Sequence, residues 1–169
     1  MFETADLLID KAKFPDWAAM YRNVWSHPES AQYMLWSITT SEEAARVRMQ
    51  KTIEFQKTHN TYTVYDKRTG DAIGFAGFEQ ISPYTYEETG ICLGPEFTGK
   101  GYGKQILECL IRYCKEDLGA KVFIYSTREA NEASKRLACS LGFQMIGSEE
   151  KIDRRNDQPY VLQKYILKL

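Results

Sequence analysis

The stretch Thr98-Gly99-Lys100-Gly101-Tyr102-Gly103-Lys104 places three glycines at alternate positions between two segments of different character. The apolar run Ile91–Leu93 precedes it, and a segment with apolar residues at helical spacing, from Ile106 to Leu118, follows it. This order predicts a strand, a glycine loop and the start of a helix. Backbone N–H groups at such a start have no intrahelical partner, and glycine lets a ligand approach them closely. Together with the charges of Lys100 and Lys104, the stretch predicts a phosphate or pyrophosphate site.

Two widespread phosphate-binding loops fit this stretch poorly. The dinucleotide pattern G-x-G-x-x-G needs a third glycine where the chain has Ile106, and an acidic residue after the next strand, where Ser126-Thr127-Arg128 stands. The P-loop pattern is met by Gly94 through Lys100, but the next residue is Gly101 rather than the Ser or Thr that holds Mg²⁺. A P-loop therefore remains a minor alternative, and it would bind ATP.

Three blocks of the chain resemble the GNAT superfamily of N-acetyltransferases. Residues Glu88 to Leu93 are similar to the family's fourth strand, and Thr98–Gly103 is a variant of its acetyl-CoA signature, [RQ]-x-x-G-x-[GA]. Asn131 and the block ending in Leu141-Gly142-Phe143 resemble the end of the family's fourth helix. These blocks cover about residues 85–147, and the segment Trp25–Trp36 resembles the RimJ/RimL-like branch, which acetylates ribosomal proteins.

Length and composition exclude several classes of protein. A chain of 169 residues predicts one domain, 1–169, and 43% hydrophobic residues exclude a disordered chain. A net charge of −1 argues against direct nucleic-acid binding or attraction to an anionic membrane, and no apolar run has the length of a membrane span. The four cysteines form no C-x-x-C pair, which predicts reduced thiols, a cytoplasmic protein and no metal site. The sequence leaves a homodimer open.

The order of predicted elements is β-α-α-β-β-β-α-β-α-β-β. Strands are expected at Leu7–Asp10, Thr61–Tyr65, Ala72–Phe78, Thr85–Leu93, Lys121–Ser126, Gln144–Ser148 and Tyr160–Leu167, and helices at Pro15–Val24, Ser41 to about Lys57, Gly103–Leu118 and Asn131–Leu141. This is an α/β fold that agrees with the family's order. The resemblance implies one mixed, mostly antiparallel sheet flanked by helices, with splayed central strands.

The resemblance also implies acetyl-CoA as co-substrate, bound where Thr85–Leu93 and Lys121–Ser126 splay apart. The pantetheine arm would pair with the backbone of Cys92 and Leu93, the Leu93 N–H would stabilise the oxyanion, and the pyrophosphate would bind the N–H groups of the glycine loop. The residues expected to bind the cofactor are Ile91, Cys92, Leu93, Gly99, Lys100, Gly101, Tyr102, Gly103, Lys104, Asn131 and Ser134.

Acetyl transfer to an amine requires a proton acceptor. Strand alternation places Glu88, Gly90 and Cys92 on one face, so Glu88 is one candidate base, with a solvated strand end as the alternative. Asp153 is a second candidate, because the RimL-like branch carries a carboxylate at that position; the alternative is a solvated loop residue beside two arginines.

Protonation of the departing thiolate requires an acid. Many family members carry a tyrosine where this chain has Ala138, and the resemblance to the RimL-like branch favours Ser134 instead, with Tyr125 and Tyr160 as weaker candidates. Ser134 could equally only cap the helix or contact the cofactor.

The acceptor is expected between the N-terminal helices and the last two strands, near Trp25, Tyr33, Trp36 and Glu87. The resemblance implies an acetyl-CoA-dependent N-acetyltransferase that acts on a primary amine, foremost a peptide or protein N-terminal α-amine. Two alternatives remain open, namely a small-amine acetyltransferase acting on a polyamine, amino acid or aminoglycoside, and a catalytically silent acyl-CoA-binding module.

Overall fold

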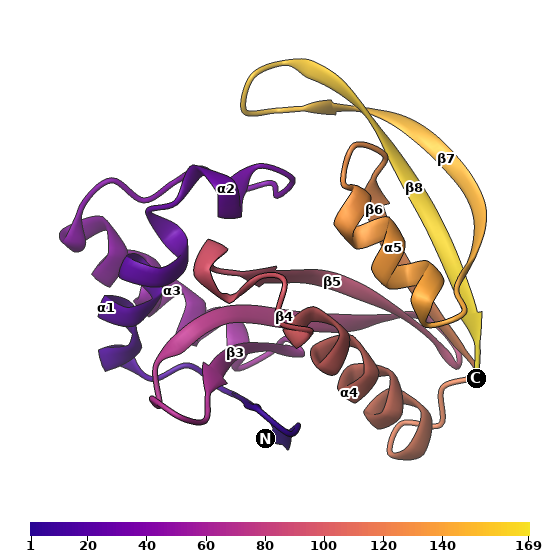
Figure 1. The fold of residues 1–169 in the computed structure, drawn as a ribbon, viewed down its shortest axis with the longest axis horizontal. Helices are drawn as coiled ribbons and strands as arrows, with labels where there is room; N and C mark the ends of the chain where they lie inside the picture. The colour runs from indigo at the N-terminus through magenta and orange to yellow at the C-terminus, as the bar shows by residue number, and fades with distance from the viewer.

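The computed structural model describes residues 1–169, and its strands form one eight-stranded sheet in the order β1-β2-β3-β4-β5-β6-β8-β7 (Figure 1). The strands are β1 (Phe2–Glu3), β2 (Leu7–Asp10), β3 (Thr61–Asp66), β4 (Ala72–Ser82), β5 (Thr85–Leu93), β6 (Val122–Arg128), β7 (Gln144–Asp153) and β8 (Gln158–Lys168). Only β5 and β6 are parallel neighbours, and the remaining pairs are antiparallel. The mixed, mostly antiparallel α/β sheet predicted from the sequence is confirmed.

Helices cover both faces of the sheet. They are η1 (Phe14–Asp16), α1 (Trp17–Met20), the π-helical η2 (Tyr21–Trp25), α2 (Pro28–Ala31), α3 (Glu42–Gln56), η3 (Pro95–Phe97), α4 (Tyr102–Glu116) and α5 (Glu132–Ser140). Helix α4 packs through Ile106 and Leu110 into a cluster with Ile73 of β4. The neighbouring residue Ala72 belongs instead to the cluster that contains Met49 of α3. Because successive strand residues face opposite sides, α4 and α3 lie on opposite faces of the sheet.

The parallel pair β5–β6 is joined at only one end. Its partners are Thr85 with Val122, Tyr86 with Phe123 and Glu87 with Ile124. The rest of β5, from Glu88 onward, has no partner on the β6 side, and the corresponding end of β6 pairs only with β8. The predicted splay of the two central strands is therefore present, and it leaves backbone groups of β5 open to a ligand (Figure 1).

Several predicted helix ends are confirmed by their caps. The Ser41 hydroxyl accepts a hydrogen bond from the Ala44 N–H at 3.1 Å, and the Asn131 side chain accepts one from the Ser134 N–H at 3.1 Å. These short side chains stabilise the starts of α3 and α5 because they satisfy N–H groups that lack intrahelical partners.

Other boundaries differ from the sequence-based expectation. The single helix expected at Pro15–Val24 is a series of 3₁₀, α and π turns, and the short elements β1, α2 and η3 were not predicted. The last two strands are longer than predicted because Asp157, at φ 56°, closes a tight turn. The expected loop Asp153–Gln158 is thus shortened, and its first and last residues pair across the hairpin.

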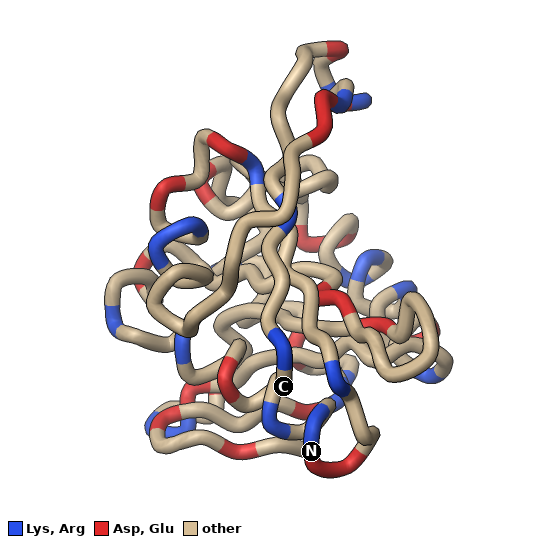
Figure 2. Tube along the Cα trace, turned by 90° about the vertical axis from the view of Figure 1, so that its right-hand side faces the viewer, with Lys and Arg blue, Asp and Glu red and all other residues tan.

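Charged residues of both signs are interspersed along the chain, including at the projecting tip of the β7–β8 hairpin (Figure 2). This distribution fits the net charge of −1. None of the helices combines the length and apolar character that crossing a membrane requires.

Candidate active site

The glycine loop forms the start of α4, as the sequence predicted. Gly99 and Gly101 have φ angles of 72° and 79°, in the left-handed region that favours glycine, and Gly101 occupies the N-cap position without a side-chain cap. The N–H of Gln105 bonds to the Gly101 carbonyl at 3.1 Å, so the preceding N–H groups of the first turn are free of intrahelical bonds. A Cβ added at Gly99 or Gly101 would meet nothing within 4 Å. The loop is thus an open cradle of N–H donors at the positive end of a helix dipole.

Strand β5 contains a bulge that changes which residues share a face. Gly90 pairs with Gly77 and Glu88 pairs with Phe78, so Thr89 is an extra residue without a partner on β4. Tyr86 packs in the α4 core, whereas Cys92 packs in the α3 core. The expectation that Glu88, Gly90 and Cys92 lie on one face is therefore wrong, because the inserted residue reverses the alternation between Glu88 and Cys92.

The hydrogen-bond ladder identifies the open backbone groups of β5. The Gly94 N–H donates to the Ile73 carbonyl of β4 at 2.9 Å. Because N–H groups alternate in direction along an antiparallel ladder, the Cys92 N–H also faces β4, while those of Ile91 and Leu93 face the gap beside β6. The cysteine side chain lies on the far face, where its thiol contacts the Ser30 carbonyl at 3.5 Å.

A cavity of about 210 Å³, here called the inter-strand cavity, lies where β5 and β6 separate. Its wall includes Glu88, Gly90, Ile91, Tyr125, Ser126, Asn131, Ser134 and Tyr160. Glu88 is 8% exposed, and its Oε1 atom is buried without a hydrogen-bond partner. Burial raises the pKa of Glu88 to about 8, with a smaller contribution from the charge of Glu87. The carboxyl group is therefore mostly protonated at neutral pH and becomes a proton acceptor as the pH approaches 8.

Tyr125 and Ser134 form a hydroxyl pair in the inter-strand cavity. The Tyr125 Oη and Ser134 Oγ atoms are 2.6 Å apart, and Tyr125 is buried. Burial raises the pKa of Tyr125, and the nearby Glu88 charge acts in the same direction. The phenol therefore stays protonated and can share its proton with Ser134. Asn131 caps α5 through Oδ1, which leaves its Nδ2 group free to donate to a ligand in the cavity.

Asp153 is buried and ion-paired. Its Oδ2 atom lies 2.8 Å from Arg128 and 2.7 Å from Arg155, and its Oδ1 atom accepts from the Arg155 backbone N–H at 3.0 Å. Hydrogen bonds from Arg155 and then Arg128 hold the pKa of Asp153 well below its usual range. A carboxylate held in this way is a poor proton acceptor, and Asp153 does not line the inter-strand cavity.

The two arginines also hold the segment between α2 and α3. Arg155 donates to the carbonyls of Ala31 and Trp36 at 2.8 and 3.0 Å, and Arg128 donates to that of Met34 at 3.3 Å. We call this group, with Asp153, the Asp153 clamp. It joins the turn of the β7–β8 hairpin to the N-terminal helices.

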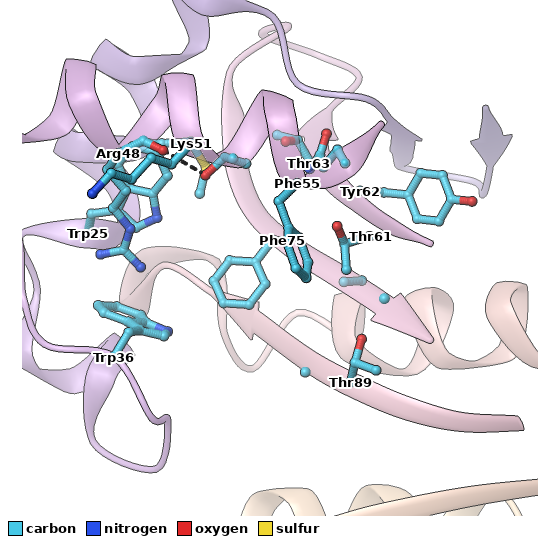
Figure 3. A pocket seen from close by; sticks show the side chains of 16 residues that line it. Trp25, Trp36, Arg48, Lys51, Phe55, Thr61, Tyr62, Thr63, Phe75 and Thr89 are labelled. Carbon is cyan, nitrogen blue, oxygen red and sulfur yellow. Dashed lines mark hydrogen bonds between the residues drawn. The ribbon is translucent and has the colours of Figure 1, made fainter. Parts of the chain in front are cut away.

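A second cavity of about 440 Å³, here called the tryptophan cavity, contains Trp25 and Trp36 in its wall (Figure 3). Its wall also includes Arg48, Lys51, Phe55, Thr61, Phe75, Thr89 and Gly90. Gly90 lines both cavities, so both reach the β5 bulge. At φ 135°, Gly90 holds a backbone conformation that other residues rarely adopt.

The other predicted acceptor residues lie elsewhere. Tyr33 lines the inter-strand cavity and donates to the Ala130 carbonyl at 3.2 Å. Glu87 lines neither cavity; it accepts from the Ser126 hydroxyl at 2.8 Å and lies 3.6 Å from the Lys164 ammonium. Of the three carboxylates predicted at the site, Glu87, Glu88 and Asp153, only Glu88 lines one of the two cavities.

Sequence reasoning missed Arg48, Phe55 and Phe75. Arg48 follows the buried Ala45 by three positions, on the apolar side of α3, which was the available signal. Phe75 lies within the predicted strand Ala72–Phe78, and only the structure shows that it faces a cavity.

A glycine-rich helix start beside two splayed strands defines the fold of an acyltransferase. Residues 6–144 match the family model described as acetyltransferase (GNAT) domain, so the chain belongs to the GNAT acetyltransferases.

Three comparisons describe its place among known proteins. An uncharacterized N-acetyltransferase p20 of Bacillus licheniformis is 29% identical over 85% of this chain and 82% of the relative. The N-alpha-acetyltransferase RimI of Mycobacterium tuberculosis is 30% identical over 60% of this chain and 63% of the relative. A solved structure of RimL, a ribosomal alpha-N-protein acetyltransferase in complex with coenzyme A, has a TM-score of 0.76 at 20% identity and covers 98% of this chain and 96% of that chain.

Proposed function

We propose that the protein transfers an acetyl group from acetyl-CoA to the α-amine of a peptide or protein N-terminus, in one step within a ternary complex. The observation that carries this proposal is that two cavities share Gly90 in their walls, with the buried carboxyl group of Glu88, of raised pKa, in the wall of one of them. The RimI and RimL relatives, both named as α-N acetyltransferases, support the choice of acceptor, and the coenzyme A bound by RimL supports the choice of donor.

The residues present fit acetyl-CoA. The open N–H groups at the start of α4 suit the pyrophosphate, with Lys100 and Lys104 adding positive charge. The unpaired N–H groups of Ile91 and Leu93 suit the amide-bearing pantetheine arm, which would occupy the gap between β5 and β6. Of these, the Leu93 N–H is the proposed donor to the oxyanion of the tetrahedral intermediate.

In the proposed reaction the neutral amine nitrogen attacks the thioester carbonyl carbon. A C–N bond forms, the carbonyl electrons move to oxygen, and the ionised form of Glu88, which becomes abundant as the pH approaches 8, takes the proton that the nitrogen loses. Collapse of the intermediate breaks the C–S bond. Ser134 protonates the leaving thiolate and regains a proton from Tyr125, which lies 2.6 Å away. The phenol then recovers its proton, and Glu88 releases the one it took, by exchange with solvent. The products are the acetylated amine and free coenzyme A.

Two measurements test the proposal. Acetyl-CoA, unlike ATP or NAD, should raise the melting temperature, because a ligand at ~100 times its Kd adds about 2.7 kcal/mol to the free energy of unfolding. Peptides with a free α-amine should release coenzyme A, while the same peptides blocked at the N-terminus should not. No stabilisation by acetyl-CoA would refute the donor assignment.

A small amine is the second candidate acceptor. The tryptophan cavity, at about 440 Å³, has the size of a small-molecule site. Turnover of small amines with no turnover of peptides would favour this reading over the first.

A further inference from the structure

The tryptophan cavity is lined by cations and lacks anions. Arg48 and Lys51 are the charged residues of its wall, and no Asp or Glu lines it. This is unexpected for the acceptor side of an enzyme whose substrate is an amine, because a cationic wall repels a second positive charge on the acceptor.

Of the two cations, Arg48 is the better placed to bind a ligand. Its guanidinium lies between the Trp25 and Trp36 rings, 4.7 and 4.4 Å from their centroids (Figure 3). It donates to the Thr39 hydroxyl at 3.0 Å and the Ser37 carbonyl at 3.5 Å, and its other N–H groups have no partner in the protein. Burial lowers the pKa of Arg48 to about 10, so it remains charged at neutral pH. A half-buried guanidinium without a counter-ion is costly unless a ligand supplies one.

Two neighbours add to the same pattern. Lys51, one turn along α3 from Arg48, is an exposed residue that forms part of the wall, and its ammonium has no salt bridge within the protein. The Trp36 indole N–H is buried without a hydrogen-bond partner. The cavity therefore combines apolar rings with donors that lack acceptors, which is the composition of a site for an apolar group that bears an anion.

We infer that the tryptophan cavity binds a carboxylate on the acceptor molecule, held by the free N–H groups of Arg48 and by Lys51. The inference rests on the proposed function and narrows it: preferred acceptors are α-amines with an acidic side chain within the first residues of the peptide. Polyamines and aminoglycosides are excluded as good substrates, because their extra positive charges would meet Arg48. A free acidic amino acid shares the recognised chemistry and forms a separate arm of the test.

The experiment compares acidic acceptors with their neutral amides. Peptides of six residues carry Asp or Asn at the first, second or third position in a neutral background, and free aspartate and glutamate are compared with asparagine and glutamine. With saturating acetyl-CoA, kcat/KM for the best Asp peptide should exceed that of its Asn partner by about tenfold or more, the effect of a hydrogen-bonded charge. The preference should shrink as salt is added.

Variants assign the preference to the cavity. Arg48→Gln should reduce the preference to about twofold or less, Arg48→Lys should keep part of it, and Lys51→Gln should lower it without affecting the fold. Arg46→Gln is the matched control, because Arg46 also stacks on a tryptophan, Trp17 at 4.0 Å, but lies outside the cavity wall. That variant should keep the full preference.

Binding measurements separate this inference from the proposed function. The enzyme with bound coenzyme A is titrated calorimetrically with the Asp and Asn peptides, which needs no turnover. Tighter binding of Asp peptides that depends on Arg48, without acetylation, would overturn the proposed function and support the anion site. Selective turnover of free acidic amino acids would support the anion site and would identify its ligand as a free amino acid rather than a peptide. Equal affinity and turnover for Asp, Asn and amide partners would overturn the inference.

Discussion

Replacing Glu88 by Gln should lower activity and, at alkaline pH, stabilise the fold. Burial raises the pKa of Glu88 from its usual 4.5 to about 8, so the folded protein holds a proton that the unfolded chain releases. Below about pH 4.5 the carboxyl group is protonated in both states and has no effect on the balance. Between that pH and about 8 the buried carboxyl group progressively lowers the free energy of unfolding, and above 8 this destabilisation is complete.

The size of the penalty follows from the two pKa values. The change from 4.5 to about 8 corresponds to roughly 5 kcal/mol, at about 1.4 kcal/mol for each factor of ten in proton affinity. Gln carries no proton to lose, so Glu88→Gln removes this penalty. For a chain of 169 residues, the melting temperature at pH 9 should rise by on the order of 10 °C, with little change at pH 4.5.

The assay is thermal unfolding of wild type and Glu88→Gln between pH 4.5 and 9. Glu87→Gln is the matched control: its carboxylate is the adjacent one, it is hydrogen-bonded to Ser126, and it should show no alkaline gain. In parallel, Glu88→Gln should lower kcat by ~10²-fold or more, with unchanged affinity for acetyl-CoA. A difference in melting temperature that does not vary with pH would refute the reasoning, because Glu88 would then not be held protonated.

Three further substitutions test the rest of the site. Gly101→Val should weaken acetyl-CoA binding by at least tenfold in calorimetry while the fold persists, because φ 79° strains a β-branched residue; wild-type affinity would show the phosphate loop is misplaced. Ser134→Ala should lower kcat by ~10²-fold or more if Ser134 is the acid, whereas a raised KM for acetyl-CoA at constant kcat would leave it a positioning role. Asp153→Asn should lower the melting temperature above pH ~4, where the carboxylate is ionised in both states, and the deficit should shrink progressively as the pH falls from that value toward the depressed pKa of the folded state; a deficit that is independent of pH would contradict the ion-pair account.

Much of the fold was predictable because its signals are local. The bounds of β5, the Ser41 and Asn131 caps and the glycine-rich start of α4 each depend on a few neighbouring residues. The predicted order of elements along the chain also holds, apart from the short β1, α2 and η3, because the periodicity of each longer strand is intact over most of its length.

The parts of the site that sequence reasoning missed depend on contacts between distant segments. Thr89 resembles any other strand residue, and its bulge appears only when β4 and β5 are paired. The polar sequence around Asp153 is typical of a solvated loop, but Arg128, 25 residues away, and Arg155 form hydrogen bonds with its carboxylate. Arg48 meets the two tryptophans only because α3 packs beside residues 25–36. No single-sequence pattern records such pairings.

The seam between β5 and β6 has a mechanical consequence for the whole molecule. Three residue pairs and the contacts of Glu87 with Ser126 and Lys164 hold one end of it. The Asp153 clamp and the hydrogen bond from Tyr33 to Ala130 hold the other. The two sides of the gap are thus held together at both of its ends, with the proposed acetyl-CoA site between them. A ligand that pairs with the open edge of β5 would add hydrogen bonds in this gap. Movement of the two sides of the gap relative to each other and ligand binding would then be thermodynamically linked. Weakening the Asp153 clamp should then shorten the time for which coenzyme A stays bound.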